Sequence, residues 1–351
     1  MEDTFAAGRV PKELTGIPTD VAAPAMTRLY SRDDVRDHID FSTTLEVVEQ
    51  TYVETANDRV LNPPKLSMHL GDDREWPDLN AFAIDMPAYV DWLDVAGVKW
   101  AIATWDAERD VPISSLILLF DPIGAEFTAV MEGMYLTGVR TAMQSVVGLK
   151  HLHSDDIGTI GVFGAGFQAE FQLRVIDHLL DVEVFDVFDV DSTRARDLVS
   201  RLEPELDASI SAATSRTEAL GGDVIITVTD SKTPVLEDSE TDGSEFIIAL
   251  GSYRELPDRT ILDADRIVVD HVEQCLQRGA LADLASRGQF TEEDIDSTIG
   301  TVLVEDGQAV VSEGERVVFV PIGLGSLDIS IAEHIRRETA GRQSLSEYDF
   351  V

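Results

Sequence analysis

A glycine-rich stretch in the middle of the chain has the pattern of a nucleotide-binding turn. An apolar run over residues 160–163 leads into Gly164, Gly166 and Ala169, in the pattern Gly-x-Gly-x-x-Ala. The first glycine permits a sharp turn, the second lets the backbone approach a pyrophosphate, and the small third residue lets helix and strand pack closely. The helix that follows would present free N–H groups and the positive end of its dipole to phosphates.

An acid stands where a dinucleotide fold needs one. Asp189 ends a second apolar strand, residues 183–189, twenty residues after Ala169. A carboxylate at this place hydrogen-bonds the adenosine ribose and repels a 2′-phosphate. We therefore predict a nicotinamide site that takes NAD, with NADP as the weaker ligand. The alternative is a structural glycine turn in an α/β domain that binds no nucleotide.

Three cations could serve an anionic amino or keto acid. Arg140 offers a bidentate fork for a carboxylate. Lys65 and Lys99 lie within apolar or proline-bounded stretches of a chain that has five lysines (Lys12, Lys65, Lys99, Lys150, Lys232). Nearby cations would depress the pKa of Lys99 and make it a usable acid or base near neutral pH. The alternatives are solvated surface lysines and an arginine in an ordinary salt bridge.

Composition and net charge limit which environments, partners and sites are possible. A net charge of −39 with acids spread along the chain indicates a halophilic cytoplasm, where salt screens self-repulsion; an acidic mesophilic protein is the alternative. The charge argues against binding nucleic acid or an anionic membrane. We expect no membrane span, no signal peptide, no metal site and a cytoplasmic location, and the single cysteine, Cys275, excludes an internal disulfide.

The 351 residues predict two domains. A polar arm precedes a helix over 40–57. Strands without intervening helices indicate a mostly antiparallel sheet. They cover residues 81–84, 98–103, 115–120 and 126–131. A helix over 137–147 then leads to the fingerprint.

From residue 157 onward, strands and helices alternate, which predicts a doubly wound parallel sheet. Its later strands are 223–228, 245–250 and 266–269, and Ser192 is the expected cap of one helix. After about residue 300 we expect a hairpin around Glu305–Gly307, a strand over 317–320 and a final helix that begins near Gly325.

Several motifs in order resemble the ornithine cyclodeaminase/mu-crystallin family, which includes archaeal alanine dehydrogenases and ketimine reductases. They are Pro63-Pro-Lys65, Met86-Pro-Ala-Tyr89, Gly97-Val-Lys99, Asp121-Pro-Ile-Gly124, Leu136-Thr-Gly-Val-Arg-Thr-Ala142 and Gly164-Ala-Gly-Phe-Gln-Ala169. The resemblance implies an α/β protein: a Rossmann domain over 153–311, and an α+β substrate-binding and dimerisation domain over 1–152 plus 312–351. It also implies a homodimer.

The resemblance also implies roles for individual residues. Lys99 would contact the substrate and serve in acid–base chemistry, and Arg140 and Lys65 would hold the substrate carboxylate. Met86 and Tyr253 complete the predicted substrate site. The predicted cofactor contacts are Thr141, Gly164, Gly166, Phe167, Gln168, Asp189, Thr227, Val228, Thr229 and Gly251.

Two departures from the family pattern bear on the reaction. Tyr253 occupies the slot where cyclodeaminases carry an aspartate that orients the substrate amine, and Asp258 lies nearby but off register. Trp105-Asp106 stands where many relatives have proline and asparagine. We therefore predict an NAD(P)-dependent oxidoreductase acting at the α-carbon of a small amino or imino acid without a distal amine. The alternatives are an ornithine cyclodeaminase and a non-catalytic protein that binds cofactor and ligand.

Overall fold

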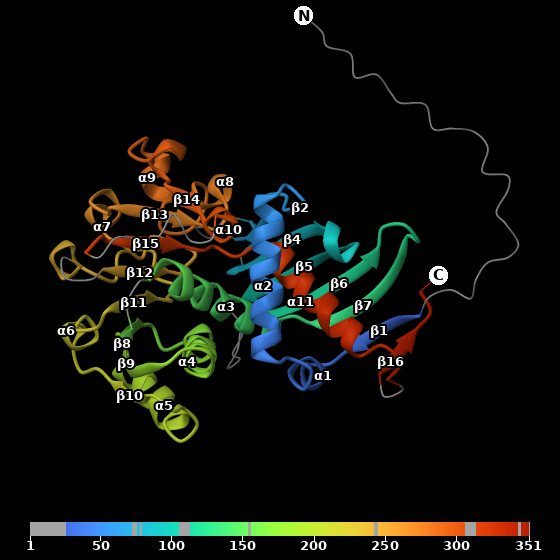
Figure 1. The fold of residues 1–351 in the computed structure, drawn as a ribbon, viewed down its shortest axis with the longest axis horizontal. Helices are drawn as coiled ribbons and strands as arrows, with labels where there is room; N and C mark the ends of the chain where they lie inside the picture. Colours follow the sequence, from blue (N-terminus) through green and yellow to red (C-terminus); the bar gives the residue numbers. More distant parts are fainter. Residues whose placement is uncertain are drawn as a thin grey trace, which may run out of the picture.

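The structure, a computed structural model, describes residues 26–71, 76–77, 79–104, 113–153, 156–241, 245–305, 314–342 and 345–350. Two eight-stranded sheets lie at opposite ends of the folded part, with helices α2 and α3 between them (Figure 1). The polar arm, Trp105-Asp106 and most of the expected hairpin near residue 306 lie outside the described residues.

The first sheet has the strand order β16-β1-β7-β6-β5-β4-β2, with β3 also paired to β4. All pairings are antiparallel except that of β1 with β7, which confirms the predicted mostly antiparallel sheet. Tight turns join β4 to β5 and β6 to β7, with Asp94 and Ala125 in the left-handed region. The strands are β1 Thr27–Tyr30, β2 Val60–Leu61, β3 Leu66–Leu70, β4 Ala81–Val90, β5 Val95–Thr104, β6 Ile113–Asp121, β7 Glu126–Glu132 and β16 Ser346–Tyr348.

Helix α11 (Gly325–Glu338) covers one face of this sheet and contacts β4, β5 and β6. Two glycines permit this close approach. A Cβ on Gly97 would lie 2.6 Å from Ile329 Cδ1, and one on Gly325 would lie 2.7 Å from the Met86 carbonyl oxygen. The helix also contacts α2 (Phe41–Ala56) and α3 (Met134–Leu152). This packing brings the last long helix against the strand that carries Lys99.

The second sheet is parallel throughout, in the order β10-β9-β8-β11-β12-β15-β13-β14. The order reverses between β8 and β11, and ligands of such sheets bind at the carboxyl ends of the strands beside this point. The strands are β8 Ile157–Phe163, β9 Val182–Phe188, β10 Ser209–Ala212, β11 Val224–Thr227, β12 Phe246–Ala249, β13 Arg266–Val269, β14 Ser297–Thr298 and β15 Val317–Val320.

Strand β15 corrects the predicted domain boundary at residue 312. It pairs in parallel with both β12 and β13, so it belongs to the Rossmann sheet. All four of its residues are buried, which suits an inner parallel strand covered on both faces. The chain therefore returns to the first sheet with α11, about a dozen residues later than expected.

Short helices connect the parallel strands. The helix expected after Ser192 is present, but Asp191 is its N-cap: its side chain accepts from the Thr193 N–H, and Ser192 is the first helical residue. The remaining helices are α1 Arg32–Arg36, α4 Phe167–Leu179, α5 Ser192–Leu202, α6 Arg216–Ala219, α7 Asp258–Leu262, α8 Val272–Cys275, α9 Ala282–Ser286 and α10 Ile299–Val304, with 3-10 turns η2 Asp91–Leu93, η3 Asp238–Glu240 and η4 Glu292–Asp294. Across the described ranges, no helix is long and apolar enough to span a bilayer.

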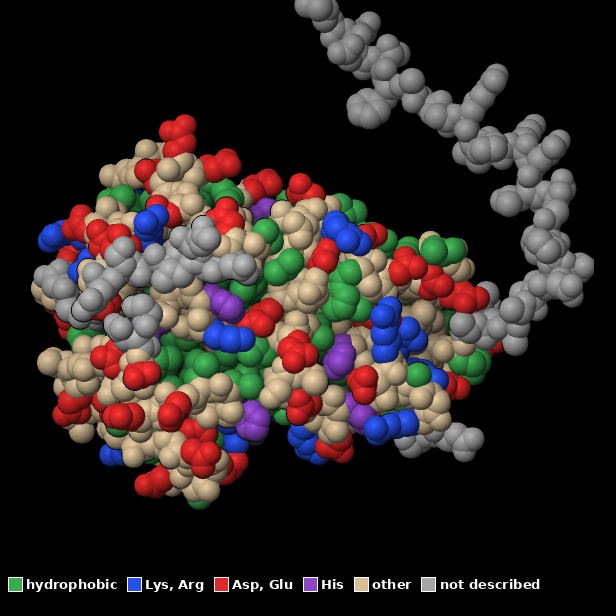
Figure 2. Space-filling view, in the orientation of Figure 1, with side chains coloured by type: hydrophobic (Ala, Val, Ile, Leu, Met, Phe, Trp, Pro, Cys, Tyr) green, Lys and Arg blue, Asp and Glu red, His purple; other side chains and the backbone are tan. Residues whose placement is uncertain are grey.

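On the face that Figure 2 shows, acidic side chains are spread out rather than gathered in one patch. Five acids are buried in the described part: Glu54, Glu255, Asp270, Asp328 and Glu333. Three of these buried acids, Glu255, Asp270 and Asp328, lie at the candidate site, where they have defined polar partners.

Candidate active site

The glycine turn has the geometry that its sequence predicts. Gly164, between β8 and α4, has a φ of +114°, and a Cβ there would lie 2.6 Å from the Val228 carbonyl oxygen. Gly166 precedes α4 with no side-chain cap, so the first N–H groups of the helix stay available to a ligand. Ala169 is fully buried against the sheet. The surroundings thus require Gly164 and a small residue at 169, while Gly166 leaves the helix N-terminus open.

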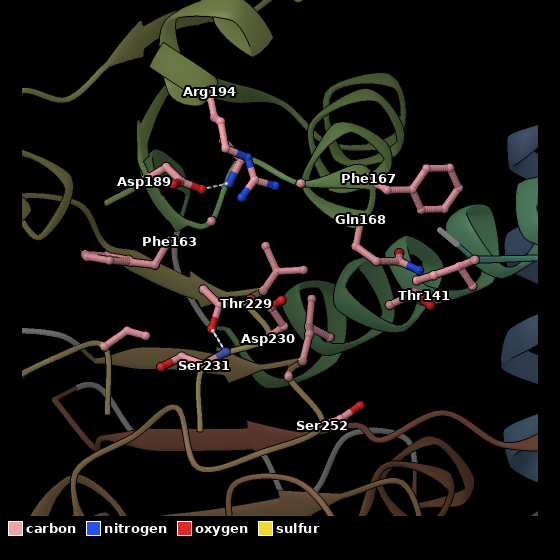
Figure 3. Close-up of a pocket in the computed structure, with 18 of the residues that line it drawn as sticks. Thr141, Phe163, Phe167, Gln168, Asp189, Arg194, Thr229, Asp230, Ser231 and Ser252 are labelled. Carbon is pink, nitrogen blue, oxygen red and sulfur yellow. Dashed lines mark hydrogen bonds between the residues drawn. The ribbon is translucent and has the colours of Figure 1, made fainter. Parts of the chain in front are cut away.

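Asp189 stands beside this turn at the end of β9. Its Oδ2 accepts a hydrogen bond from the Ala165 N–H at 2.9 Å, and its Oδ1 accepts from the Asp191 N–H at 2.9 Å. These bonds hold the carboxylate at the mouth of the turn, with lone pairs left for a ribose hydroxyl. Arg194 lies next to it, over the glycine turn (Figure 3).

A cavity of about 990 Å³ extends from Asp189 past the glycine turn to Arg140 and Ser252. Nearly all of the predicted cofactor contacts line it, as Figure 3 shows in part. The lining includes Thr141, Gly164, Gly166, Phe167, Gln168, Asp189, Val228, Thr229 and Gly251. Thr227 does not line the cavity, because its side chain is buried behind the wall. The role of Thr227 in cofactor binding therefore stays a prediction, and its side-chain hydroxyl is bound to Glu255.

Glu255, which we did not predict, explains the position of Thr227. Its carboxylate accepts hydrogen bonds from Thr227 Oγ1 (2.9 Å), Thr229 N (2.6 Å), Thr229 Oγ1 (2.6 Å) and Gly251 N (2.6 Å). Burial raises the pKa of Glu255, and these bonds oppose that shift. The buried carboxylate ties together the loops after β11 and β12, which form the floor of the cavity.

The residues present fit a dinucleotide. The glycine turn is open to a ligand, since a Cβ on Gly166 would have no protein atom closer than 3.6 Å. Gln168 Oε1 is buried and has no hydrogen-bond partner in the described part of the chain. A phosphate-and-sugar ligand would supply polar partners at this turn, while Asp189 suits the ribose.

Lys99, Arg140 and Asp328 meet at the inner end of the cavity. Lys99 on β5 is 2% exposed, and its Nζ lies 3.1 Å from Asp328 Oδ1 and 3.0 Å from Oδ2. Arg140 on α3 lines the cavity, and its Nε donates to Asp328 Oδ1 at 3.3 Å. Burial and the charge of Arg140 lower the pKa of Lys99 to about 8, although Asp328 raises it. Lys99 can therefore change its protonation near neutral pH.

The orientation of Arg140 is fixed by a buried network. Its Nη1 donates to Gln144 Oε1 (2.9 Å), and the amide of Gln144 donates to Tyr52 Oη (2.9 Å) and to Asp270 Oδ2 (3.1 Å). Gly323, at φ +81°, leaves space for the guanidinium, since a Cβ there would lie 2.2 Å from Nη1. Nη2 has no hydrogen-bond partner in the described residues, which leaves it available to a ligand.

Lys65 lies close to this cluster. Its Nζ donates to the Ile322 carbonyl oxygen at 2.6 Å, and Ile322 lines the cavity. Burial, together with Arg278, Arg140 and Lys99, lowers the pKa of Lys65 to about 7, while Asp270 acts in the opposite direction. Met86 is buried and pairs in register with Lys99. Lys65, Lys99 and Met86 lie directly behind the lining residues rather than among them.

The structure separates Tyr253 from this cluster. Tyr253 is 37% exposed and lines a second cavity, with Lys232 Nζ 5.5 Å from its ring centre. Asp258 is bound to Arg254 (2.7 Å) and Arg287 (2.8 Å), so it is not available to a substrate amine. Neither residue therefore places a free carboxylate where a distal amine would need one.

Asp328 and Asp270 are buried acids of the candidate site that our sequence reasoning missed. Asp328 is the only charged residue between Val317 and Ala332, and a lone acid in so apolar a run is a signal that could have been used. Asp270 directly follows an apolar strand in the same way. Among the described residues, no group of three or more His, Cys, Asp and Glu side chains could hold a metal ion.

Comparison with known proteins shows which family the chain resembles over most of its length. The model of the ornithine cyclodeaminase/mu-crystallin family matches residues 26–343. The chain is similar to an alanine dehydrogenase of Archaeoglobus fulgidus (28% identity, covering 92% of this chain and 98% of the relative). It is also similar to a Δ1-pyrroline-2-carboxylate reductase of Bacillus cereus (25% identity, covering 90% and 97%).

Two solved structures share the fold. One is an archaeal alanine dehydrogenase dimer with bound NAD, with a TM-score of 0.83 and 26% identity over 93% of this chain and all of that one. The other is the Δ1-pyrroline-2-carboxylate reductase of Thermococcus litoralis in complex with NADH and L-proline, with a TM-score of 0.83 and 23% identity over 91% and 99%.

Proposed function

Since the chain belongs to the ornithine cyclodeaminase/mu-crystallin family, we propose that it is an NAD-dependent oxidoreductase acting at the α-carbon of a small amino or imino acid. One observation carries the proposal: a single cavity joins the dinucleotide cradle to the Arg140 end of a cationic cluster. There Lys65, Lys99 and Arg140 face two carboxylates, Asp270 and Asp328, which leaves one positive charge when both lysines are protonated. In a chain with a net charge of −39, this excess suits an anionic substrate.

Each residue has a role in this proposal. Arg140, through its free Nη2, and Lys65 bind the substrate carboxylate. Lys99 Nζ exchanges a proton at the substrate nitrogen, and Asp328 orients Lys99 and Arg140 together. Bound NAD(H) would supply the hydride chemistry at the α-carbon of a substrate held by these residues. The relatives named for alanine dehydrogenase and pyrroline carboxylate reduction support this reaction class.

An absorbance assay at 340 nm tests the proposal. We expect 2-oxo acids with ammonia, or cyclic imines, to consume NADH. The alternative, ornithine cyclodeamination, uses NAD catalytically and would release proline and ammonia without a net change at 340 nm. The Lys232 charge beside Tyr253 disfavours a substrate with a distal amine, so we expect little proline from ornithine. The third reading, a non-catalytic binding protein, predicts cofactor binding with neither reaction.

The position of Asp189 predicts a preference for NADH over NADPH of at least about tenfold, because one misplaced charge costs ~1.4 kcal/mol or more. Asp189→Ser should narrow this preference. As a control, Asp186→Asn, on the same strand but bonded to Ser211 outside the cavity, should leave it unchanged. Fluorescence titration of both cofactors provides the measurement. Equal binding of the two cofactors by the native protein would show that Asp189 does not face the ribose.

Exposed apolar side chains on one face of the first sheet support a homodimer. Leu66, Met68, Trp100, Ile102 and Leu116 are exposed apolar residues on β3, β5 and β6. Trp100 on β5 pairs directly with Leu116 on β6. On its other side, Trp100 pairs with the β4 residue that in turn pairs with Leu66 on β3. Paired residues of neighbouring strands point to the same side of a sheet, so these three side chains share one face. The opposite face is covered by α11. A second copy of the chain is the proposed partner, as in the archaeal alanine dehydrogenase dimer.

Trp100→Asp is expected to convert the dimer to a monomer, because it places a charge at the centre of this apolar face. Light scattering after size-exclusion chromatography measures the mass. Leu262→Asp, a comparably exposed position on α7 in the other half of the molecule, is the matched control and should stay dimeric. A native protein that runs as a monomer would remove this proposal.

The spread of acids supports a cytoplasm of high ionic strength as the working environment. With −39 charges, screening by salt should relieve self-repulsion of the folded state. We expect the thermal midpoint to rise steeply between dilute buffer and molar KCl, as measured by circular dichroism. A midpoint that stays constant across this range would contradict the halophilic assignment and leave the enzyme assignment untouched.

A further inference from the structure

A second cavity adjoins the first. It has a volume of about 460 Å³ and shares Ser252 with the cofactor cavity. Lys232, Tyr253 and Arg278 line it, together with Arg254 and Asp283. Three of the four Lys, Arg, Asp and Glu residues in this lining are cations, and the single acid, Asp283, is already paired with Arg287.

Arg278 has no carboxylate partner in the described part of the chain. Its side chain is half-buried, and its one hydrogen bond is from Nη2 to Ser252 Oγ at 3.1 Å. Burial lowers the pKa of the Arg278 guanidinium, and only the Tyr253 phenol opposes this shift. The chain has 66 acids and 27 Lys and Arg residues, so a partly buried arginine without a neighbouring acid is unexpected. A bound anionic ligand would supply the missing negative charge.

The neighbouring charges make the contrast clear. Arg254 lines the same cavity, but it is paired with Asp258 at 2.7 Å and lies 3.6 Å from Asp283. Asp283 is in turn bound by Arg287 at 2.9 Å. These charges balance among themselves. The described residues place no carboxylate within ion-pair distance of Lys232, whose ammonium lies over the Tyr253 ring.

Arg278 is connected to the inner end of the cofactor cavity. The next residue, Gly279, has a φ of +83°, and a Cβ there would lie 2.9 Å from Ile322 Cγ2. The carbonyl of Ile322 holds Lys65 Nζ, and Gly279 N donates to the Ser252 carbonyl at 3.3 Å. The charge of Arg278 also contributes to lowering the pKa of Lys65. A ligand bound at Arg140 and Lys65 could therefore extend past Ser252 toward Arg278.

We propose that the second cavity binds a distal carboxylate of the substrate through Arg278 and Lys232, so that this enzyme acts on a dicarboxylic amino or imino acid. The inference rests on the proposed oxidoreductase function and specifies its substrate class. The α-carboxylate binds at Arg140 and Lys65, and the distal one neutralises the cations around Tyr253. A guanidinium binds a carboxylate bidentately, which gives the site selectivity over an apolar group of equal size.

Isosteric substrate pairs test the proposal. Oxaloacetate is compared with 4-methyl-2-oxopentanoate, and 2-oxoglutarate with 5-methyl-2-oxohexanoate, each with ammonia and NADH. In each pair an isopropyl group replaces the distal carboxylate. We expect kcat/KM to favour at least one dicarboxylate over its partner by about tenfold or more, as for a charge-assisted hydrogen bond. Equal or lower values for both dicarboxylates would overturn the proposal.

Two variants assign the selectivity to the cavity. Arg278→Gln should lower the ratio of the two kcat/KM values about tenfold or more. Arg254→Gln removes an arginine from the same cavity whose charge is already balanced, and it should leave the ratio unchanged. A ratio that is unchanged in Arg278→Gln, or that falls equally in both variants, would contradict a specific role for Arg278.

A binding measurement keeps the proposal testable if no 2-oxo acid is turned over with ammonia. Succinate and glutarate, compared with 4-methylpentanoate and 5-methylhexanoate, should raise the thermal midpoint of the NADH-saturated protein more than these isosteres do. The difference should disappear in Arg278→Gln. Absence of any NADH turnover together with this difference would sink the proposed redox function but support the second carboxylate site. Equal midpoints would overturn the second site.

Discussion

Lys99→Met is expected to lower kcat by about 10²- to 10⁴-fold, the usual contribution of a general acid–base group. NADH binding should be nearly unchanged, because Lys99 lies behind the substrate end of the cavity and not at the glycine turn. Lys99→Arg preserves the ion pair with Asp328 but cannot release its proton near neutral pH, so it should lose a comparable factor. Steady-state kinetics and a cofactor titration measure the two effects.

Lys150→Met is the matched control, since Lys150 is an exposed lysine on α3 that pairs with Glu49. It should retain native kinetics. Native kinetics in Lys99→Arg would contradict an acid–base role, because that variant keeps the charge and loses only the proton exchange. Circular dichroism checks that Asp328, left beside Arg140 alone in Lys99→Met, has not destabilised the fold.

The pH dependence of kcat shows whether Lys99 accepts or donates a proton. With a pKa of about 8, Lys99 is protonated below that pH and neutral above it. For oxidation of an amino acid the neutral amine accepts a proton, so kcat should rise as pH increases through about 8. For imine reduction the ammonium donates, so kcat should fall over the same range. The inflection should be lost in Lys99→Arg, whereas one that persists unchanged belongs to another group.

Arg140→Lys is expected to raise the substrate KM by about 10- to 100-fold, as for loss of 1.5–3 kcal/mol from hydrogen bonds to a charged group. The lysine keeps the charge but loses the bidentate geometry of the guanidinium. Its single ammonium group cannot bond Asp328 and Gln144 while it also reaches a substrate carboxylate. NADH affinity should change little. Initial-rate kinetics and cofactor titration separate the two.

Arg174→Lys is the control for this substitution. Arg174 lies on α4, on the surface, in ion pairs with Glu170 and Glu205, and its replacement should leave KM unaltered. A native KM in Arg140→Lys would show that the guanidinium only holds Asp328 and Gln144 in place. The substrate carboxylate would then depend on Lys65.

The buried acids Asp270 and Asp328 fix the positions of the cations without neutralising all of them. Asp328 contacts both Lys99 and Arg140, while Asp270 bonds Gln144, the Gly323 N–H and Cys275. Each carboxylate thus accepts bonds from more than one group. These bonds hold the side chains of the cluster in place but do not cancel its positive charge. In the function that we propose, a substrate carboxylate would supply the missing negative charge, so we expect activity to depend strongly on these few residues.

The sequence by itself determined the parts of the protein that depend on neighbours along the chain. The turn at Gly164 and Gly166, the packing of Ala169 and the place of Asp189 follow from local sterics and the length of one strand–helix–strand unit. Successive strand-like runs without intervening helices likewise predicted strands β4 to β7 in a mostly antiparallel sheet. Lys65, Lys99 and Arg140 could be singled out by their types and by family resemblance.

The tertiary structure decided everything that joins distant segments. Asp328 is 229 residues from Lys99, and their contact depends on how α11 packs across β5 through Gly97 and Gly325. Strand β15 entered the parallel sheet because its four buried residues need cover on both faces, a requirement that the local pattern does not assign to either sheet. The cations around Tyr253 came together in the same way, from loops whose relative placement only the packed sheet and helices determine.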